Sequence, residues 1–106
     1  MFLGNYSDRW EYISPFAIPS VLWSLYSFLR TPDNFLETMQ TSICMGGDVD
    51  TTAAMAGAIS GAYLGIDALP QSFAIHVTDN GTWGYDELIS LASDCYDIKH
   101  SQREAL

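Results

Sequence analysis

Six consecutive residues, Gly46-Gly-Asp-Val-Asp-Thr51, combine chemical groups that bind hard cations with a turn that can present them. Two carboxylates and one hydroxyl fall within four positions, directly after a pair of glycines. Oxygen donors of this kind suit Mg²⁺, which takes near-octahedral geometry and keeps several waters. Glycine lets the backbone turn sharply and lets a ligand come close. The run therefore predicts a divalent-cation site.

The competing interpretation is a helix cap. An Asp at the start of a helix commonly accepts hydrogen bonds from the free N–H groups of the first turn. One carboxylate suffices for that purpose, and a second one nearby adds repulsion unless a cation offsets it. The pair Asp48 and Asp50 therefore favours a cation over a cap. Three oxygen donors do not fill octahedral coordination, so further donors must come from elsewhere.

The elements that must position this run are helices. Apolar residues recur at helical spacing, and no convincing alternating strand is present, which predicts an all-α fold. A helix that begins at about Asp48 to Thr51 and ends near Leu64, with Gly65 as its C-cap, would carry the carboxylates. The other expected helices run from Pro19 to about Leu29, from a Thr31 N-cap to about Ile43, and from about Tyr85 to Lys99.

The helix behind the carboxylates is rich in small residues, which let neighbouring backbones approach closely. We expect it to be a central helix enclosed by the others. Its two rows at four-residue spacing are Ala53, Gly57, Gly61, Gly65 and Ala54, Ala58, Ala62. The apolar stripes expected to pack around it are Val21, Leu22, Leu25, Tyr26, Phe28, Leu29; Phe35, Leu36, Met39, Ile43; and Leu88, Leu91, Ala92, Cys95, Tyr96.

The composition of the chain argues against nucleic-acid binding and against a membrane span. The chain has 106 residues, 13 acidic and 4 basic side chains, and a formal net charge of -9. Such an acidic chain is a poor nucleic-acid binder, because that affinity rests on Lys and Arg neutralising phosphates. Ile13–Leu29 is short for a membrane span and contains two prolines. Cys44 and Cys95 lie far apart, which favours buried, reduced thiols in a cytoplasmic protein, and we expect no membrane contact.

Other candidate groups are weaker. His76 stands in an apolar setting, which favours a packed histidine, whereas His100 in a polar tail is expected to be solvated. Cys44 has no nominated base that would activate it as a nucleophile. Trp10 and Tyr12 are core residues by default, although either could line the edge of a ligand site.

Residues Gly46–Pro70 closely resemble the C-terminal signature of the ADP-ribosylglycohydrolase family. The resemblance extends over nearly the whole chain: Ser14–Leu29 and Asp33–Phe35 look like the helix pair ahead of the signature, and Asp86–Tyr96 looks like the closing helix. It implies an all-α, orthogonal helical bundle. It also implies Mg²⁺- or Mn²⁺-dependent hydrolysis of the glycosidic bond between ADP-ribose and a protein or small-molecule acceptor.

Mapped residue by residue, the resemblance implies that Asp48, Asp50 and Thr51 are metal ligands and that Asp50 bridges two ions. Asp48 and Asp50 would then act in catalysis through the bound metal. The two ions would orient the ribose hydroxyls and a water for attack at the anomeric carbon. Gly46 and Gly47 would pass close to the ribose, as substrate-binding positions.

Length is the main departure from the family. Family members are considerably longer, and their N-terminal part supplies a Thr-Asp-Asp run of further ligands that this sequence lacks. Residues 1–106 are therefore expected to correspond to the C-terminal portion of such a domain, as a fragment, a split partner or a degenerate remnant. We expect the isolated monomer to be inactive, and the chain to form a homo-oligomer or to pair with a missing N-terminal half.

Two alternatives remain open. A non-catalytic fragment could retain only oligomerisation or metal binding, and exposed helix faces would favour its association. Asp48-Val-Asp50-Thr-Thr52 also matches the D-x-D-x-T nucleophile motif of haloacid dehalogenase-like phosphatases. That motif needs a buried strand before it, and the Gly-Gly turn and the sole Lys99 fit it poorly.

Overall fold

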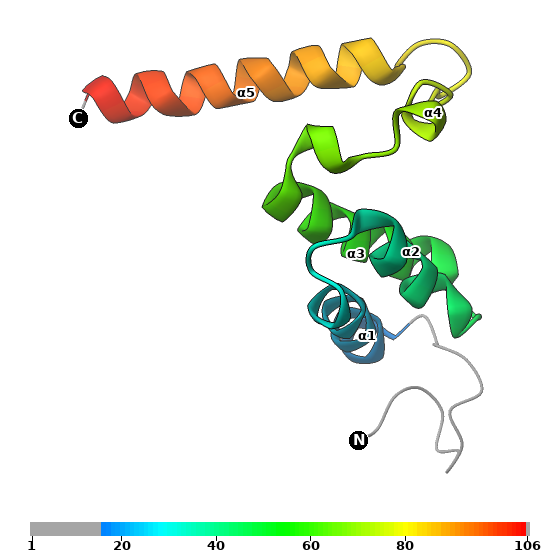
Figure 1. The fold of residues 1–106 in the computed structure, drawn as a ribbon. Coiled ribbons are helices and arrows are strands. Elements are labelled where there is room, and N and C mark those ends of the chain that lie inside the picture. Colours follow the sequence, from blue (N-terminus) through cyan, green and yellow to red (C-terminus); the bar gives the residue numbers. More distant parts are fainter. Residues whose placement is uncertain (1–15, 106) are drawn as a thin grey trace. The chain divides into compact units, whose positions relative to one another are not determined.

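The chain folds into helices joined by short turns. The computed structural model describes residues 16–105, which contain no β-strand; an isolated β-bridge joins Thr78 and Gly84 (Figure 1). This confirms the all-α prediction. The chain divides at Leu69 and Pro70 into two compact units. The elements are α1 Ala17–Arg30, α2 Phe35–Cys44, α3 Val49–Leu64, the 3₁₀ turn η1 Ile66–Ala68, α4 Gln71–Ala74 and α5 Tyr85–Ala105.

The turn between α1 and α2 corrects one predicted cap. Thr31 ends α1, and its backbone N–H donates to the carbonyl of Phe28. The N-cap of α2 is Asn34, whose side-chain oxygen accepts the Glu37 N–H at 3.0 Å, so the prediction that Thr31 caps this helix was wrong. Asn is as good a cap as Thr, and Asn34 has the extended backbone that an N-cap needs.

The first unit consists of α1, α2, α3 and η1, and hydroxyl side chains fill its interior. Among the residues whose side chains the structure describes, Ala56 is the one fully buried hydrophobic residue. Small hydroxyl side chains allow close contact between helix backbones. The buried polar residues are Ser20, Ser24 and Ser27 from α1, Thr38, Thr41 and Ser42 from α2, and Thr52 and Ser60 from α3.

Hydrogen bonds tie these helices together at backbone carbonyls. Ser24 Oγ lies 2.7 Å from the carbonyl oxygen of Ser20 on its own helix and 3.1 Å from that of Thr52 on α3. Trp23 Nε1 donates to the carbonyl of Ser42, at 3.1 Å, on α2. A buried hydroxyl is tolerated only when it is paired, and pairing it with a carbonyl already inside a helix requires no additional polar side chain.

The buried row of α3 differs from both rows that the sequence suggested. Thr52, Ala56 and Ser60 are fully buried, also at four-residue spacing. Gly57 faces α2, where a Cβ would lie 3.2 Å from Met39 Sδ, so this glycine does permit a close approach. The alanine row at 54, 58 and 62 is exposed, and α3 is therefore covered on the α1 and α2 sides rather than enclosed.

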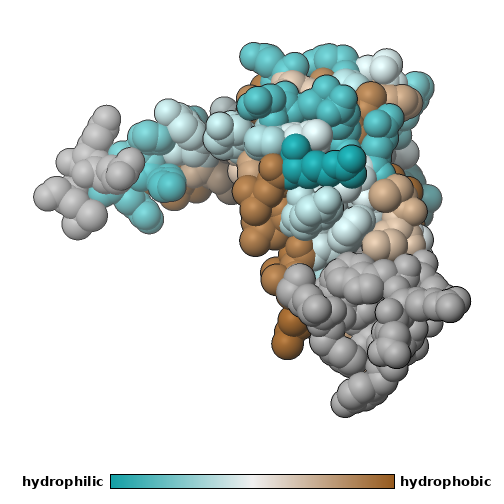
Figure 2. Space-filling view, turned by 60° about the horizontal axis from the view of Figure 1, so that its bottom comes forward, coloured by the Kyte–Doolittle hydropathy of each residue, from teal (hydrophilic) through white to brown (hydrophobic). Residues whose placement is uncertain are grey.

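Large apolar residues lie at the surface of this unit, so the predicted stripes are buried only in part: Leu22, Phe28, Phe35 and Met39 are half-buried. Val21, Leu25 and Leu29 are exposed because α1 turns its serine face, offset around the helix, toward α3. Brown residues accordingly reach the molecular surface in Figure 2. No helix in the described part of the chain has the length and apolar character needed to cross a membrane.

The second unit consists of α4, a tight turn and α5. Asp79 Oδ1 accepts the N–H groups of Thr82, at 3.1 Å, and of Trp83. Asn80 and Gly81 both have positive φ, of 62° and 94°, so the predicted Asp-Asn-Gly turn is confirmed. α5 runs six residues beyond its predicted end at Lys99. Its expected core face is exposed: Leu88, Leu91, Ala92, Cys95 and Tyr96.

The environment of the Ser60 hydroxyl predicts how its removal changes the stability of the chain. Its hydroxyl is buried without a hydrogen-bond partner, which costs about 1–3 kcal/mol. Ser60→Ala should therefore raise the free energy of unfolding, by about 1 kcal/mol, in denaturant titrations followed by circular dichroism. Ser24→Ala is the matched control, because it makes the same change at a paired hydroxyl and should destabilise. If both variants shifted the midpoint in the same direction, the unpaired state of Ser60 would be disproved.

Candidate metal centre

Two glycines in left-handed conformation connect α2 to α3. Gly46 has φ 75° and Gly47 has φ 77°, values that cost other residues energy. The Gly46 N–H donates to the Ile43 carbonyl at 3.1 Å, and the Val49 N–H donates to the Gly47 carbonyl at 2.9 Å. The chain thereby reverses direction within a few residues and delivers Asp48 at the start of α3.

The structure brings the three predicted ligands together. Asp48 occupies the N-cap position of α3, but its side chain caps no backbone N–H. Instead Asp48 Oδ1 accepts the hydroxyl of Thr51 at 3.0 Å, and Asp50 Oδ1 accepts the backbone N–H of Thr51 at 3.0 Å. The cap interpretation therefore fails for Asp48, and both carboxylates retain oxygen lone pairs that no described residue uses.

The electrostatics of this cluster favour an ionised Asp50. A hydrogen bond with the Asp48 side chain and then one from the N–H of Thr51 hold the pKa of the Asp50 carboxyl below its ordinary value. Asp50 is exposed and Asp48 is half-buried. Two acidic groups this close together either share a proton or attract a cation. The first turn of α3 is thus a place where a cation relieves repulsion.

Residues that sequence reasoning missed hold the start of α3 in place. Thr52 is fully buried, and its hydroxyl lies 3.3 Å from the Asp48 carbonyl and 3.4 Å from the Ser42 carbonyl. Ser24 donates to the Thr52 carbonyl from α1. The available signal was the spacing of Ser20, Ser24 and Ser27, which marks one helical face as surely as an apolar stripe.

The donor set fits a hard cation but is incomplete. Asp48, Asp50 and Thr51 offer oxygen atoms only, as Mg²⁺ and Mn²⁺ prefer, and they stand on a rigid helix start. Within residues 16–105, no three or more His, Cys, Asp or Glu side chains are grouped so that they could hold a metal ion. The remaining ligands of a closed site must therefore come from water, substrate or other protein groups.

The two histidines belong to the second unit. His76 is exposed, so the prediction of a packed histidine was wrong. His100 is half-buried against the Tyr96 ring, with centroids 4.0 Å apart, rather than fully solvated.

The cysteines offer no catalytic alternative. Cys44 and Cys95 are free, but both are exposed, so the expectation of buried thiols was wrong. Cys44 Sγ is 3.1 Å from the carbonyl of Thr41, a contact that does not activate a thiol. Trp10 and Tyr12, the possible ligand-edge aromatics, lie outside the described residues.

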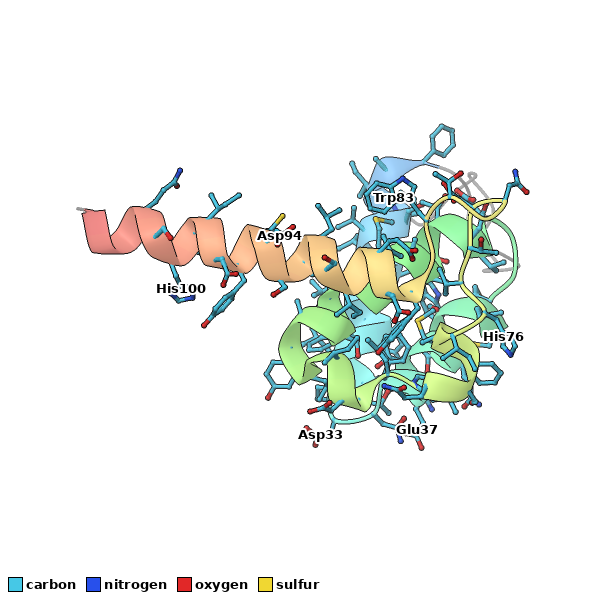
Figure 3. All side chains as sticks on the ribbon, turned by 90° about the horizontal axis from the view of Figure 1, so that it is seen from above. Asp33, Glu37, His76, Trp83, Asp94 and His100 are labelled. Atoms are coloured by element: carbon cyan, nitrogen blue, oxygen red, sulfur yellow. The ribbon has the colours of Figure 1, made fainter. Side chains whose placement is uncertain are left out.

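A second candidate is an open concavity of about 410 Å³ along α5. Figure 3 shows Trp83 and Asp94 of its lining. Three of the six side chains that line it are acidic, and none is basic, so it repels phosphorylated ligands and is a poor site for them. The lining residues are Trp83, Asp86, Glu87, Ser90, Leu91 and Asp94.

The phosphatase alternative lacks its supporting element. Its first Asp must follow a buried β-strand, but the residues before Asp48 are α2 and the glycine turn. Lys99, the lysine available to it, lies on α5 in the other unit. The geometry gives no support to a phosphatase motif at Asp48-Val-Asp50.

Comparison with known proteins returns one family. Residues 4–105 match the ADP-ribosylglycohydrolase family. Among curated proteins, the chain is 42% identical over 87 residues to ADP-ribosylhydrolase ARH3 of Danio rerio, in a match covering 79% of this chain and 22% of that protein. It is 40% identical over 92 residues to ADP-ribosylhydrolase ARH3 of Homo sapiens, covering 77% and 24%.

These matches cover most of this chain but only a small part of each relative. The chain spans about a quarter of the length of the curated relatives that it matches. No solved structure matches it.

Substitutions in the glycine turn can separate the cost of backbone strain from the cost of steric contact. Gly46→Ala should destabilise the chain by about 1–2 kcal/mol because a Cβ is strained at its φ of 75°, although nothing lies within 4 Å of that Cβ. Gly61→Ala is the control: its Cβ also meets open space, but in a helix, and it should stabilise by up to about 1 kcal/mol. Equal midpoints for Gly46→Ala and the unmodified chain would show that the turn carries no strain.

Proposed function

The chain belongs to the ADP-ribosylglycohydrolase family, and we propose that it supplies one half of a binuclear Mg²⁺ or Mn²⁺ site that hydrolyses the glycosidic bond between ADP-ribose and an acceptor. The other half comes from further ligands outside the described residues. The acceptor is a protein side chain or a small molecule. This proposal accounts for a chain that carries a well-formed ligand cluster but covers about a quarter of its relatives' length.

One observation carries the proposal: the Asp at the start of α3 does not cap the helix. Asp48 occupies the cap position, yet its carboxylate turns to the hydroxyl of Thr51. Asp50, in the first turn, is exposed and has a lowered pKa. The helix start thus presents two carboxylates and a hydroxyl together, beside the partial positive charge of the helix N-terminus.

Each residue then has a defined part in the reaction. Asp48, Asp50 and Thr51 are the residues that would hold the cation. The divalent cation, when bound, would orient the ribose hydroxyls and activate a water for attack at the anomeric carbon. Gly46 and Gly47 lack side chains that would obstruct a ribose approaching the helix start. Thr52 and Ser24 act as positioning residues, because they fix the backbone from which the ligands project.

The charge of the chain restricts how an ADP-ribose substrate is held. ADP-ribose carries a diphosphate, and the chain has only 4 basic residues against 13 acidic ones. The diphosphate must therefore be held by the cations, by backbone N–H groups or by other protein groups. The names of the curated relatives, ADP-ribosylhydrolases, agree with this class.

A non-catalytic role is the second candidate, favoured by the incomplete ligand set. In that role the chain binds a partner or a single cation and hydrolyses nothing. The two roles differ in one measurable respect: only the first requires Asp48 and Asp50 for turnover once a complete site is assembled.

Cation binding is the first test. The chain should bind Mn²⁺ weakly in calorimetric titration, and Asp48→Asn or Asp50→Asn should each weaken binding by about tenfold or more, that is, by at least about 1.4 kcal/mol. Asp33→Asn is the matched control, because Asp33 is an exposed acid in the turn before α2 and lies outside the cluster. Equal affinity in all three variants would mean that Mn²⁺ binds the general acidic surface, and the proposed site would be rejected.

Turnover is the second test. The isolated chain, held monomeric and supplied with Mg²⁺ and an ADP-ribosylated peptide, should release no ADP-ribose, because its three donors leave the coordination incomplete. Release is measured by chromatography of the free nucleotide. Turnover by the verified monomer would show that this chain alone is sufficient and would refute the half-site proposal.

A further inference from the structure

Asn80 and Gly81 stand next to each other at the tip of the turn that precedes α5. Both residues are exposed, and both have positive φ, of 62° and 94°. Asparagine is a thermolabile residue, because the backbone nitrogen of the following residue can attack its side-chain amide carbon. Glycine as the following residue has no Cβ to obstruct that approach. A Cβ built at Gly81 would meet no atom within 4 Å, so the surroundings of the pair are open as well.

A hydrogen bond to a neighbouring hydroxyl restrains the attacking nitrogen. The Gly81 N–H donates to Thr78 Oγ1 at 2.8 Å. Attack requires this nitrogen to lose its proton, and a donated hydrogen bond favours the protonated amide. Reaction therefore waits until the turn opens and the bond to Thr78 breaks. The bond lies on the exposed surface, where local opening needs little free energy.

We infer that Asn80-Gly81 is a site of spontaneous deamidation and that the Thr78 hydroxyl controls its rate. In the first step the Gly81 nitrogen bonds to Cγ of Asn80 and the Cγ–Nδ2 bond breaks. The proton of the Gly81 amide leaves with the side-chain nitrogen as ammonia, and a succinimide ring remains. Water is the second reactant. Its addition at the former side-chain carbonyl gives aspartate, and its addition at the backbone carbonyl gives iso-aspartate.

Iso-aspartate at position 80 would disrupt the turn. It places an extra carbon in the main chain, between contacts that now close across the tip. The Asp79 N–H donates to the Trp83 carbonyl at 3.1 Å, and Asp79 Oδ1 accepts the Thr82 N–H, also at 3.1 Å. A longer chain cannot keep both contacts and the bridge between Thr78 and Gly84. The modification thus releases the segment that leads into α5, and it uses no residue of the candidate metal centre.

The first experiment follows the mass of each asparagine peptide while the full chain is kept in warm neutral buffer. The Asn80 peptide should gain the mass that accompanies replacement of an amide by an acid. Part of the product should accept a methyl group from an iso-aspartyl methyltransferase. Asn34 is the internal control: it is also exposed, but Phe35 follows it and its side-chain oxygen accepts the Glu37 N–H at 3.0 Å. The Asn34 peptide should keep its mass.

The second experiment tests the role of the hydroxyl. Thr78→Val removes Oγ1 and keeps the branched shape and the backbone of the residue. It should speed deamidation by about threefold or more, because a hydrogen bond of ordinary net strength no longer has to be broken. Asn80→Gly is the unreactive control, since glycine adopts the same positive φ without strain and has no amide to lose.

The third experiment measures hydrogen exchange at the turn before and after the incubation. Protection of the Thr82 amide should fall in the unmodified chain in proportion to the iso-aspartate formed. In Asn80→Gly the protection should stay constant, which separates the effect of the modification from slow unfolding of the chain.

Four results would overturn the inference. An unchanged Asn80 peptide in the folded chain, under conditions in which a sample unfolded in urea reacts, would reject the site. Equal rates at Asn34 and Asn80 would mean that exposure alone governs the reaction. An equal or slower rate in Thr78→Val would reject control by the hydroxyl. Full protection of Thr82 in the chain that contains iso-aspartate would reject disruption of the turn.

Discussion

The close contact between α1 and α3 at Ser24 and Thr52 determines much else in the first unit. A hydrogen bond from a side chain to a carbonyl on another helix requires the two backbones to be near each other. That proximity leaves room only for small side chains between them, which explains the buried row of Thr52, Ala56 and Ser60. It also fixes the rotation of α1, since the face with Ser20, Ser24 and Ser27 must point inward and the large apolar residues must point out.

The same contact supports the candidate centre. A ligand cluster performs well only when its supporting backbone is rigid. Here the first turn of α3 is held from α1 by Ser24, from α2 by the Ser42 carbonyl, and from the preceding loop by two glycines in a conformation that is strained for other residues. Because the Asp48 side chain does not cap the helix, this rigidity does not depend on its carboxylate.

The sequence predicts what is decided locally and misses what tertiary contact decides. The bounds of α3, its Gly65 C-cap, the Asp79-Asn80-Gly81 turn and the proximity of the three ligand residues all follow from a few adjacent residues. The N-cap of α2 was missed because Thr31 and Asn34 are both good caps, and the end of α1 occupies the first of them.

The buried face of α1 was missed for a different reason. Hydrophobic periodicity identifies the face that gains most from leaving water, but not the surface that covers it. In α1 that apolar face points outward. The apolar pattern was correctly identified, but its assignment to the interior of this chain was wrong. The small residues of α3 signalled close packing correctly, yet which of its rows meets α1 depends on a helix far away in sequence, with Ser24 lying 28 residues before Thr52.

An interior made of hydroxyls has a calorimetric consequence. The heat capacity change of unfolding rises with the apolar area exposed and falls with the polar area exposed, so the first unit, taken alone, should have a small value for its size. The free energy of unfolding then varies only slowly with temperature, on both the cold and the warm side of its maximum. Covering the outer apolar surface would increase the heat capacity change of unfolding and make the free energy of unfolding depend more steeply on temperature.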